Sequence, residues 1–187
     1  MGTIFVDNIK QQSSQGSGTI TIGASGETVA LASGVKQSNL LTPAFRANSS
    51  TDQTGVSDST WTQVEYANED FDTDNDFASN QCTISIAGKY IFMASARILS
   101  ASATNYLKRA FLRILRTRSS TDTSVSFGGT DIRDNPAYSM VVKTTSVLEC
   151  QVGDVYKVQI FGDVTSGNVT IANNADMGLF TAYRIGT

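Results

Sequence analysis

Four aspartates at every second position are the first residues of this sequence that could do chemistry. The stretch EDFDTDNDF, residues 69–77, contains Asp70, Asp72, Asp74 and Asp76. Carboxylate oxygens are ligands that Ca²⁺ prefers in proteins. An EF-hand loop beginning at Asp70 would need glycine at its sixth position and glutamate at its twelfth, but Asn75 and Gln81 stand there. A loop beginning at Asp72 also lacks the glycine at its sixth position.

An extended conformation would place these four aspartates on one face of a strand, with Phe71 and Phe77 on the other. Four like charges on one face repel one another, and either a bound cation or basic groups of a neighbouring subunit would relieve the repulsion. Two interpretations stay open: a calcium site formed by the four aspartates, or an acidic loop that faces solvent or another subunit. We expect the second, which needs no cofactor.

Acidic and basic residues occupy different segments of the chain. Eight of the seventeen acids lie between Asp52 and Asp76, whereas residues 77–121 contain no acid and seven of the fourteen bases. In a self-associating chain, the basic segment of one subunit would meet the acidic segment of the next. Alternatively, Arg109, Arg113 and Arg116 would contact an anionic glycan or a lipid phosphate on a host surface. We expect subunit pairing, because one chain carries segments of both charges. A third interpretation also stays open, in which each charged segment simply faces solvent.

Trp61 is a further candidate for ligand binding, because it follows the polar stretch NSSTDQTGVSDST, residues 48–60. An indole on such a loop would stack on a sugar of a host-surface glycan. The ordinary role of an aromatic residue on a strand is packing in the core or along the axis of an assembly. We expect packing for Trp61 and keep the glycan as the alternative.

The composition argues against catalysis. The chain has no histidine, which removes the commonest general base and the commonest transition-metal ligand. It contains neither a G-x-S-x-G motif nor a P-loop, and its carboxylates are crowded into polar segments. We expect no enzyme activity, with a carboxylate glycosidase as a distant alternative.

Charge and hydropathy also limit the partners. The net charge is −3, so no affinity for nucleic acid is expected. No run of 18 or more apolar residues occurs, so no membrane insertion is expected, and MGTIFVDNIK does not resemble a secretory leader. Cys82 and Cys150 are interpreted as buried free thiols rather than as a disulfide.

From Leu40 onward the chain alternates short apolar strands with turns. The clearest strand segments are STWTQVEYAN (59–68), QCTISIAGKYIFMASARIL (81–99) and SMVVKTTSVLECQVGDVYKVQIFGDV (139–164). Many short strands at this spacing predict a sandwich or barrel.

One segment does not follow that alternation. Apolar residues stand at helical spacing between residues 105 and 120: Leu107, Ala110, Phe111, Ile114 and Leu115. Periodicity alone predicts an amphipathic helix there.

Residues 1–38 differ from the rest. Two short alternating pieces, Ile20–Ile22 and Val29–Leu31, are separated and closed by glycines. Each piece has too few apolar groups to offset the entropy of ordering it alone. We interpret residues 1–38 as a short extended β-stalk or attachment segment and residues 39–187 as the head.

Several motifs in the head stand in the order typical of one known family. They are Ala44-Phe45, Phe71-Asp72, Phe77, Gly88-Lys89-Tyr90-Ile91-Phe92, SVLECQVGDVYKVQI (146–160) and MGLFTAY (177–183). Together they resemble the globular head of the C1q and tumour necrosis factor (TNF) superfamily, over about residues 43–185. The resemblance implies an all-β antiparallel jelly-roll sandwich that assembles as a tight homotrimer, with 104–118 as a central strand buried on both sides. Heads of this family sometimes carry calcium.

The N-terminal stretch VDNIKQQSSQGSGTITIGASGETVALASG, residues 6–34, resembles N-terminal segments of virion proteins from marine bacteriophages. The two resemblances imply a trimeric phage tail fibre or appendage, made in the host bacterial cytoplasm and incorporated in the virion. Residues 1–38 would contact other virion proteins, and the head would bind the host surface or attach to the particle. The alternatives are a trimeric capsid decoration protein and a secreted C1q-type glycan-binding module.

Overall fold

The head is built from β-strands. The computed structural model describes residues 43–102, 106–172 and 174–186, and within these ranges it contains strands and no helix. The strands are β1 (Ala44–Asn48), β2 (Gln53–Val56), β3 (Thr62–Gln63), β4 (Asn68–Asp72), β5 (Phe77–Ala78), β6 (Gln81–Thr83), β7 (Gly88–Ser100), β8 (Leu107–Arg118), β9 (Thr121–Asp131), β10 (Ser139–Cys150), β11 (Val155–Val164), β12 (Val169–Ile171) and β13 (Leu179–Gly186). The predicted all-β class is confirmed. The predicted stalk and its boundary at residue 39 lie outside the described residues.

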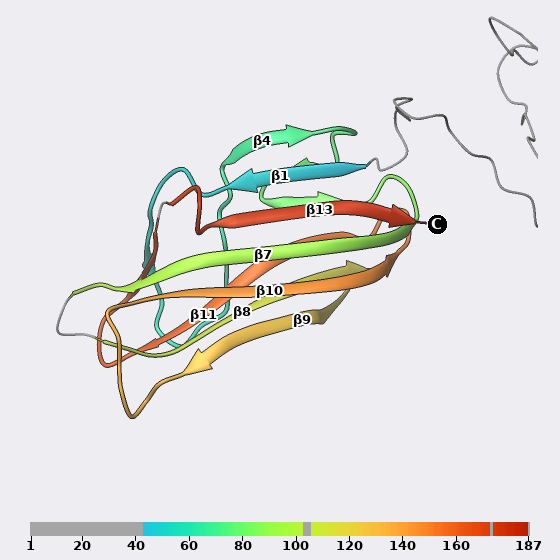
Figure 1. Ribbon diagram of the computed structural model, residues 1–187. Helices are drawn as coiled ribbons and strands as arrows, with labels where there is room; N and C mark the ends of the chain where they lie inside the picture. Colours follow the sequence, from blue (N-terminus) through green and yellow to red (C-terminus); the bar gives the residue numbers. More distant parts are fainter. Residues whose placement is uncertain (1–42, 103–105, 173, 187) are drawn as a thin grey trace, which may run out of the picture. The chain divides into compact units, whose positions relative to one another are not determined.

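Two antiparallel sheets pack face to face as a jelly-roll sandwich (Figure 1). The first sheet has the order β2-β12-β7-β13-β1-β4, and β10 pairs with the other edge of β7. The second sheet has the order β5-β6-β11-β8-β9, and β3 pairs with β11. Because β7 is thirteen residues long, it pairs with β12 near one end and with β13 near the other. In the described part of the chain, no helix is long and apolar enough to cross a membrane.

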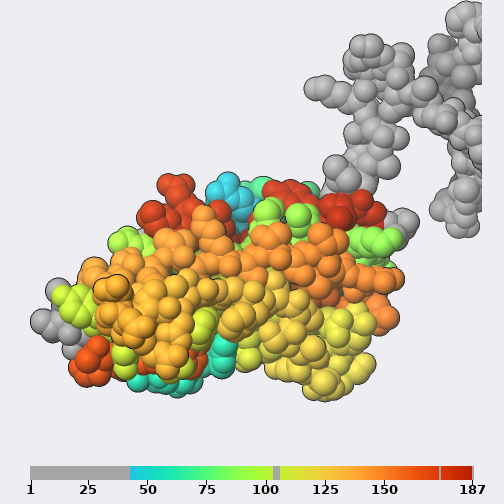
Figure 2. Space-filling view, turned by 60° about the horizontal axis from the view of Figure 1, so that its bottom comes forward, coloured from blue at the N-terminus to red at the C-terminus, as the bar shows by residue number. Residues whose placement is uncertain are grey.

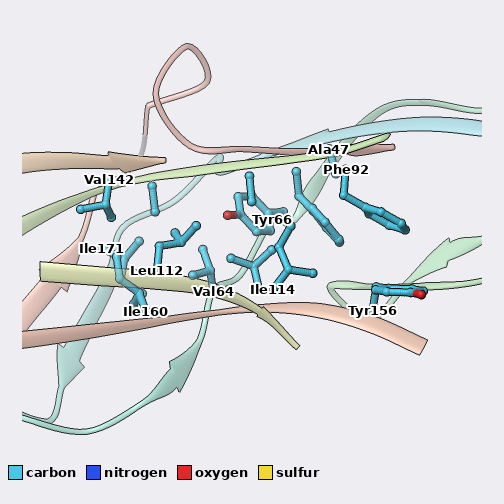
Figure 3. Close-up of a cluster of buried hydrophobic side chains, with 14 of the residues drawn as sticks. Ala47, Val64, Tyr66, Phe92, Leu112, Ile114, Val142, Tyr156, Ile160 and Ile171 are labelled. Carbon is cyan, nitrogen blue, oxygen red and sulfur yellow. The ribbon is translucent and has the colours of Figure 1, made fainter. Parts of the chain in front are cut away.

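The core lies between the sheets and follows the period of two that strands require. Alternate residues of β7 face inward and are buried, among them Tyr90, Phe92 and Ile98. Side chains from β11 and β8, including Tyr156 and Leu112, meet them from the second sheet (Figure 3). Cys82 and Cys150 are both buried and free.

The helix predicted from periodicity over residues 107–118 is wrong, because this segment is strand β8. Ladder hydrogen bonds join it to β11 on one side and to β9 on the other. Ala110, Leu112 and Ile114 point into the core with period two and are fully buried. Two sheet partners and a buried face outweigh the intrinsic helical preference of a 12-residue segment. The alternating residues on the other face are half-buried, so the strand is central but is fully enclosed on one side only.

One side of the sandwich is closed where β9 approaches β10 (Figure 2). Ser126 and Thr144 share a hydroxyl hydrogen bond across the two sheets. A Cβ atom at Gly128 would lie 2.1 Å from the carbonyl oxygen of Lys143, so only glycine allows the backbones to come this close.

The two ends of the described chain meet at one end of the sandwich. The N–H of Arg184 donates to the carbonyl of Pro43 at 3.0 Å, just before β1 begins. At the opposite end, the N–H groups of Ser100 and Leu107 donate to the carbonyls of Tyr138 and Ala137, so the end of β7 and the start of β8 lie beside the end of the connection between β9 and β10.

The turn between β10 and β11 is held by a buried carboxylate. Asp154 is 2% exposed, accepts from Arg118 Nε at 2.6 Å and from the Gln151 N–H at 2.9 Å. Burial alone would raise the pKa of the Asp154 carboxyl, but the bonds from Arg118 and Gln151 outweigh it and lower that pKa below its ordinary value. The neighbouring Gly153 has φ +86°, which suits glycine at this turn.

Replacing this carboxylate tests the contribution of the turn. We expect Asp154→Asn to lower the free energy of unfolding at pH 7 by about 2–3 kcal/mol, because Arg118 loses a charged partner. A pKa lowered by folding stabilises above the unfolded pKa, and that stability is lost as the pH falls through the folded pKa. The difference between wild type and variant, measured by thermal unfolding, should therefore shrink in acid.

Asp122→Asn is the matched control, since Asp122 forms an exposed ion pair with Lys157 at 3.5 Å. Its effect should stay below about 1 kcal/mol. Equal unfolding temperatures of wild type and Asp154→Asn at pH 7 would contradict the role assigned to Asp154.

Candidate functional site

The outward face of the first sheet carries large apolar side chains that the sandwich does not cover. Register places Tyr183, Ile91 and Val147 in one row across β13, β7 and β10. Val147 is 58% exposed. We call the following set the apolar face: Phe71, Ile91, Met93, Val141, Val147 and Tyr183. On β7, β10 and β13 these residues alternate with residues that face the core, so they point away from it.

The apolar face is hollowed between β7, β10 and β13. A depression of about 410 Å³ is lined by Met93, Lys143, Thr181 and Tyr183, among others. Phe71 lies against Tyr183, with ring centroids 6.3 Å apart. Large apolar side chains gathered on one surface are typical of interaction sites.

The outward face of the second sheet carries four aromatic rings in mutual contact. They come from the segment before β3 and from β8, β9 and β11, and we call them the aromatic platform: Trp61, Phe111, Phe127 and Phe161. Each ring contacts two others, with centroids 5.3–6.2 Å apart. Phe127 is 59% exposed.

Arg113 is part of the same surface. Its guanidinium lies over the Trp61 ring, 4.2 Å from the centroid, a cation–π contact. Gln159 Oε1 accepts from Arg113 Nε at 2.9 Å and from Nη2 at 2.6 Å. The structure thus brings together two of the residues predicted for binding, Trp61 and Arg113, in one fixed arrangement.

Arg109 borders the platform and is neutralised within the chain. Its guanidinium lies 5.6 Å from the centroid of Phe161, and its Nη2 pairs with Asp163 at 2.6 Å. Lys108 also pairs with Asp163, at 3.1 Å. Burial alone would raise the pKa of Asp163, but the hydrogen bonds from Lys108 and Arg109 outweigh it and lower that pKa. Within the chain, the partner of this basic pair is therefore on β11, and the predicted pairing between the basic and acidic segments of two subunits stays a prediction.

Arg116 is separated from the other two predicted arginines. It lies opposite Tyr156 in the register of β8 and β11, in the inward row, whereas Arg109 and Arg113 belong to the outward row. Its Nε is buried and has no hydrogen-bond partner among the described residues. The three arginines therefore do not form one cluster.

The four aspartates of residues 70–76 are divided among different tasks. Asp70 pairs with Arg46 at 3.2 Å and accepts from Asn48 Nδ2 at 2.8 Å. Asp72 accepts from the Phe77 N–H at 2.7 Å and so closes the turn between β4 and β5. The segment is not one extended strand, because β4 ends at Asp72 and Asn75 adopts φ +58°.

This turn does not gather the carboxylates around one point. Among the described residues, no group of three or more His, Cys, Asp or Glu side chains is arranged to hold a metal. Asp76 is only 6% exposed. Burial raises the pKa of the Asp76 carboxyl, hydrogen bonds from Ser85 oppose this, and the charges of Asp72 and Asp74 add to the rise.

Sequence reasoning missed most of the aromatic platform. Phe111, Phe127 and Phe161 are up to 50 residues apart, and only the register of β8 with β9 and β11 brings them together. The alternation Arg109-x-Phe111-x-Arg113 was the available signal, but the helical spacing of the same segment obscured it.

Comparison with known proteins identifies the fold. No protein-family model matches the chain, and no curated protein matches its sequence. Murine APRIL, in its structure at pH 8.5, has a TM-score of 0.57 and 10% identity over 76% of this chain and 98% of that chain. The globular domain of zebrafish complement 1qA has a TM-score of 0.51 and 19% identity over 77% and 98%. The head has the C1q/TNF-type jelly-roll fold. Identities this low establish the fold alone, and the phage-like origin of residues 1–38 stays a prediction.

The buried carboxyl of Asp76 provides a test of the turn. We expect Asp76→Asn to raise the melting temperature at pH 7 by about 2–4 °C, the shift that ~1 kcal/mol produces in a chain of this size. A carboxyl whose pKa is raised by folding costs stability wherever it is ionised, and an amide oxygen still accepts from the Ser85 N–H.

The gain should fade as the pH falls through the folded pKa, because Asp76 is then protonated and neutral in the wild type as well. Asp134→Asn, at an exposed position in the connection between β9 and β10, is the matched control and should change the free energy of unfolding by less than about 0.5 kcal/mol. A lower melting temperature for Asp76→Asn at pH 7 would refute the assignment.

Proposed function

We propose that this chain is a self-associating head module that forms a homotrimer through the apolar face. The observation that carries the proposal is the exposure of Phe71, Met93 and Val147 on the outward side of a complete sandwich. Burying such residues against a second copy removes apolar area from water, which is the main driving force of association. In a closed ring of three, the apolar face of one copy contacts a different surface of the next.

The choice of three copies is supported by the fold. The C1q and TNF heads that the sequence resembles assemble as tight trimers, and the apolar face lies on the sheet formed by β4, β1, β13, β7 and β10. Polar groups border the apolar face, among them the Arg46–Asp70 pair and Lys143. An apolar centre with a polar rim is the usual anatomy of a specific interface.

We further propose that the trimer is a structural, non-enzymatic component of a bacteriophage particle, as a tail fibre or appendage. The support is the resemblance of residues 6–34 to virion N-terminal segments. In this proposal residues 1–38 attach the protein to other virion proteins, and the head faces the host surface. Labelling of intact particles with an antibody to the head tests the location: label at the tail supports the proposal, and label over the shell indicates a capsid decoration protein instead.

The trimer itself is tested by mass in solution. We expect the full chain to run in light scattering at three times its 20.0 kDa mass. Val147→Asp should shift the protein to monomer at micromolar concentration, because the interface would bury an unpaired charge.

Val152→Asp is the matched control, since Val152 is 66% exposed but lies in the turn between β10 and β11, away from the apolar face. This variant should remain trimeric. A monomeric wild-type chain, or a Val147→Asp variant that keeps the wild-type mass, would sink the proposal.

A further inference from the structure

The aromatic platform is the second unusual surface of the head, and the trimer proposal does not use it. Its four rings lie on outward positions of the second sheet, where alternation would ordinarily place polar residues. Within the described ranges no strand covers the ring of Phe127, which is the most exposed large apolar side chain after Val152. Apolar groups left open in this way mark a surface that meets something else.

One ring of the platform lies directly on the backbone of β9, and the planes of neighbouring rings are inclined by 32–65°. A Cβ atom at Gly129 would be 2.5 Å from Phe111 Cδ1 and 2.3 Å from the Ala110 carbonyl oxygen. Glycine at this position therefore lets Phe111 lie down across the strand toward Phe127. The four rings form one continuous aromatic surface, which suits an extended ligand that lies along the sheet.

The platform has a positive charge, that of Arg113, which no ion pair within the described chain neutralises, although Asp122 lies near enough to interact with it. Arg113 has a neutral amide, Gln159, as its hydrogen-bond partner, and none of the ion pairs among the described residues includes it. Four and five residues earlier on the same strand, Arg109 and Lys108 pair with the carboxylate of Asp163, and Asp131 stands opposite Arg109 in the register of β8 and β9, so Arg113 is the cation that this surface offers to a ligand.

This combination selects the class of ligand. The C–H bonds on the face of a pyranose ring carry partial positive charge and meet the negative face of an aromatic ring. A guanidinium at the same surface binds a carboxylate or sulfate strongly and with defined geometry. The aromatic rings and the Arg113 guanidinium beside them therefore fit a sugar that carries an acid group.

A second copy of the chain is the alternative occupant of the same surface. Two carboxylates of its acidic segment are already engaged, since Asp70 pairs with Arg46 and Asp72 accepts from the amides of its own turn. The mass of the Phe127→Ala variant distinguishes this occupant from a glycan.

We propose that the aromatic platform with Arg113 binds an anionic polysaccharide. The rings of Phe127 and Trp61 contact the sugar faces, and Arg113 binds the acid group. The inference gives a ligand class to the host-surface role proposed above and rests on that role for its biological meaning. Its test is independent, because glycan binding and trimer mass are separate measurements.

The experiment measures binding of the full-length chain to three polymers by surface plasmon resonance. Polygalacturonate supplies charged pyranose rings, dextran supplies neutral pyranose rings, and polyglutamate supplies charge without sugar. We expect saturable binding to polygalacturonate that weakens as salt is raised, and at least about tenfold weaker binding to dextran and to polyglutamate.

Two variants assign the binding to this surface. Phe127→Ala should weaken polygalacturonate binding about fivefold or more, and Arg113→Gln about tenfold, with the trimer mass and melting temperature of Phe127→Ala unchanged because its ring is mostly exposed. The matched controls are Tyr138→Ala, another exposed aromatic ring, and Arg133→Gln, an exposed guanidinium in the connection between β9 and β10. Both controls should bind like wild type.

Several results would overturn the inference. Equal binding to polyglutamate would show attraction by charge alone, and equal binding to dextran would show a neutral-sugar site. Wild-type binding by Phe127→Ala, or no binding to any of the three polymers by a protein that is trimeric, would place the ligand elsewhere. A change of mass in Phe127→Ala would show that a second copy covers the platform.

Discussion

Stacking of aromatic rings between the two sheets is the interaction on which the rest of the structure depends. Phe92 of β7 lies 4.4 Å from Tyr156 of β11, centroid to centroid, and 6.2 Å from Phe180 of β13. Phe45 of β1 then contacts Phe180 and Phe77, each at 5.0 Å. These rings join the strands of both sheets in one continuous cluster, so the separation and orientation of the sheets follow from their packing.

Both candidate surfaces are consequences of that cluster. Once alternate residues of β7, β8 and β11 are committed to the core, the residues between them must point outward. On β7 this places Ile91 and Met93 on the apolar face, and on β8 it places Phe111 and Arg113 on the aromatic platform. Apolar side chains at outward positions do not help one copy to fold, which is why we assign them to contacts with other molecules.

Alternation, turn residues and family-like motifs were enough to predict the class of fold. The strands of residues 81–99 and 139–164 were readable because apolar and polar residues alternate there. Residues 107–118 were not readable in the same way, because a strand between two partners takes its conformation from its ladders and not from its own period. The motif resemblance predicted a strand for this segment, which is correct, whereas periodicity predicted a helix.

The candidate sites could be predicted only in part. Trp61 and Arg113 were identified from residue type and local context, and they do lie together. Their aromatic neighbours depend on strand register, which a single sequence does not specify. The path of the aspartate segment could not be predicted from its alternation, because the side chain of Asp72 bonds to nearby N–H groups and turns the backbone after β4.

Pro43 and Arg184 meet at one end of the sandwich, so the first and last strands of the head begin and end close together. A domain with this arrangement can be exchanged as a unit. Replacement of the whole domain by recombination would require a structurally compatible junction at only one end of the sandwich. The connections near residues 132–138 and 165–168 lie at the other end, so insertions there leave the junction undisturbed.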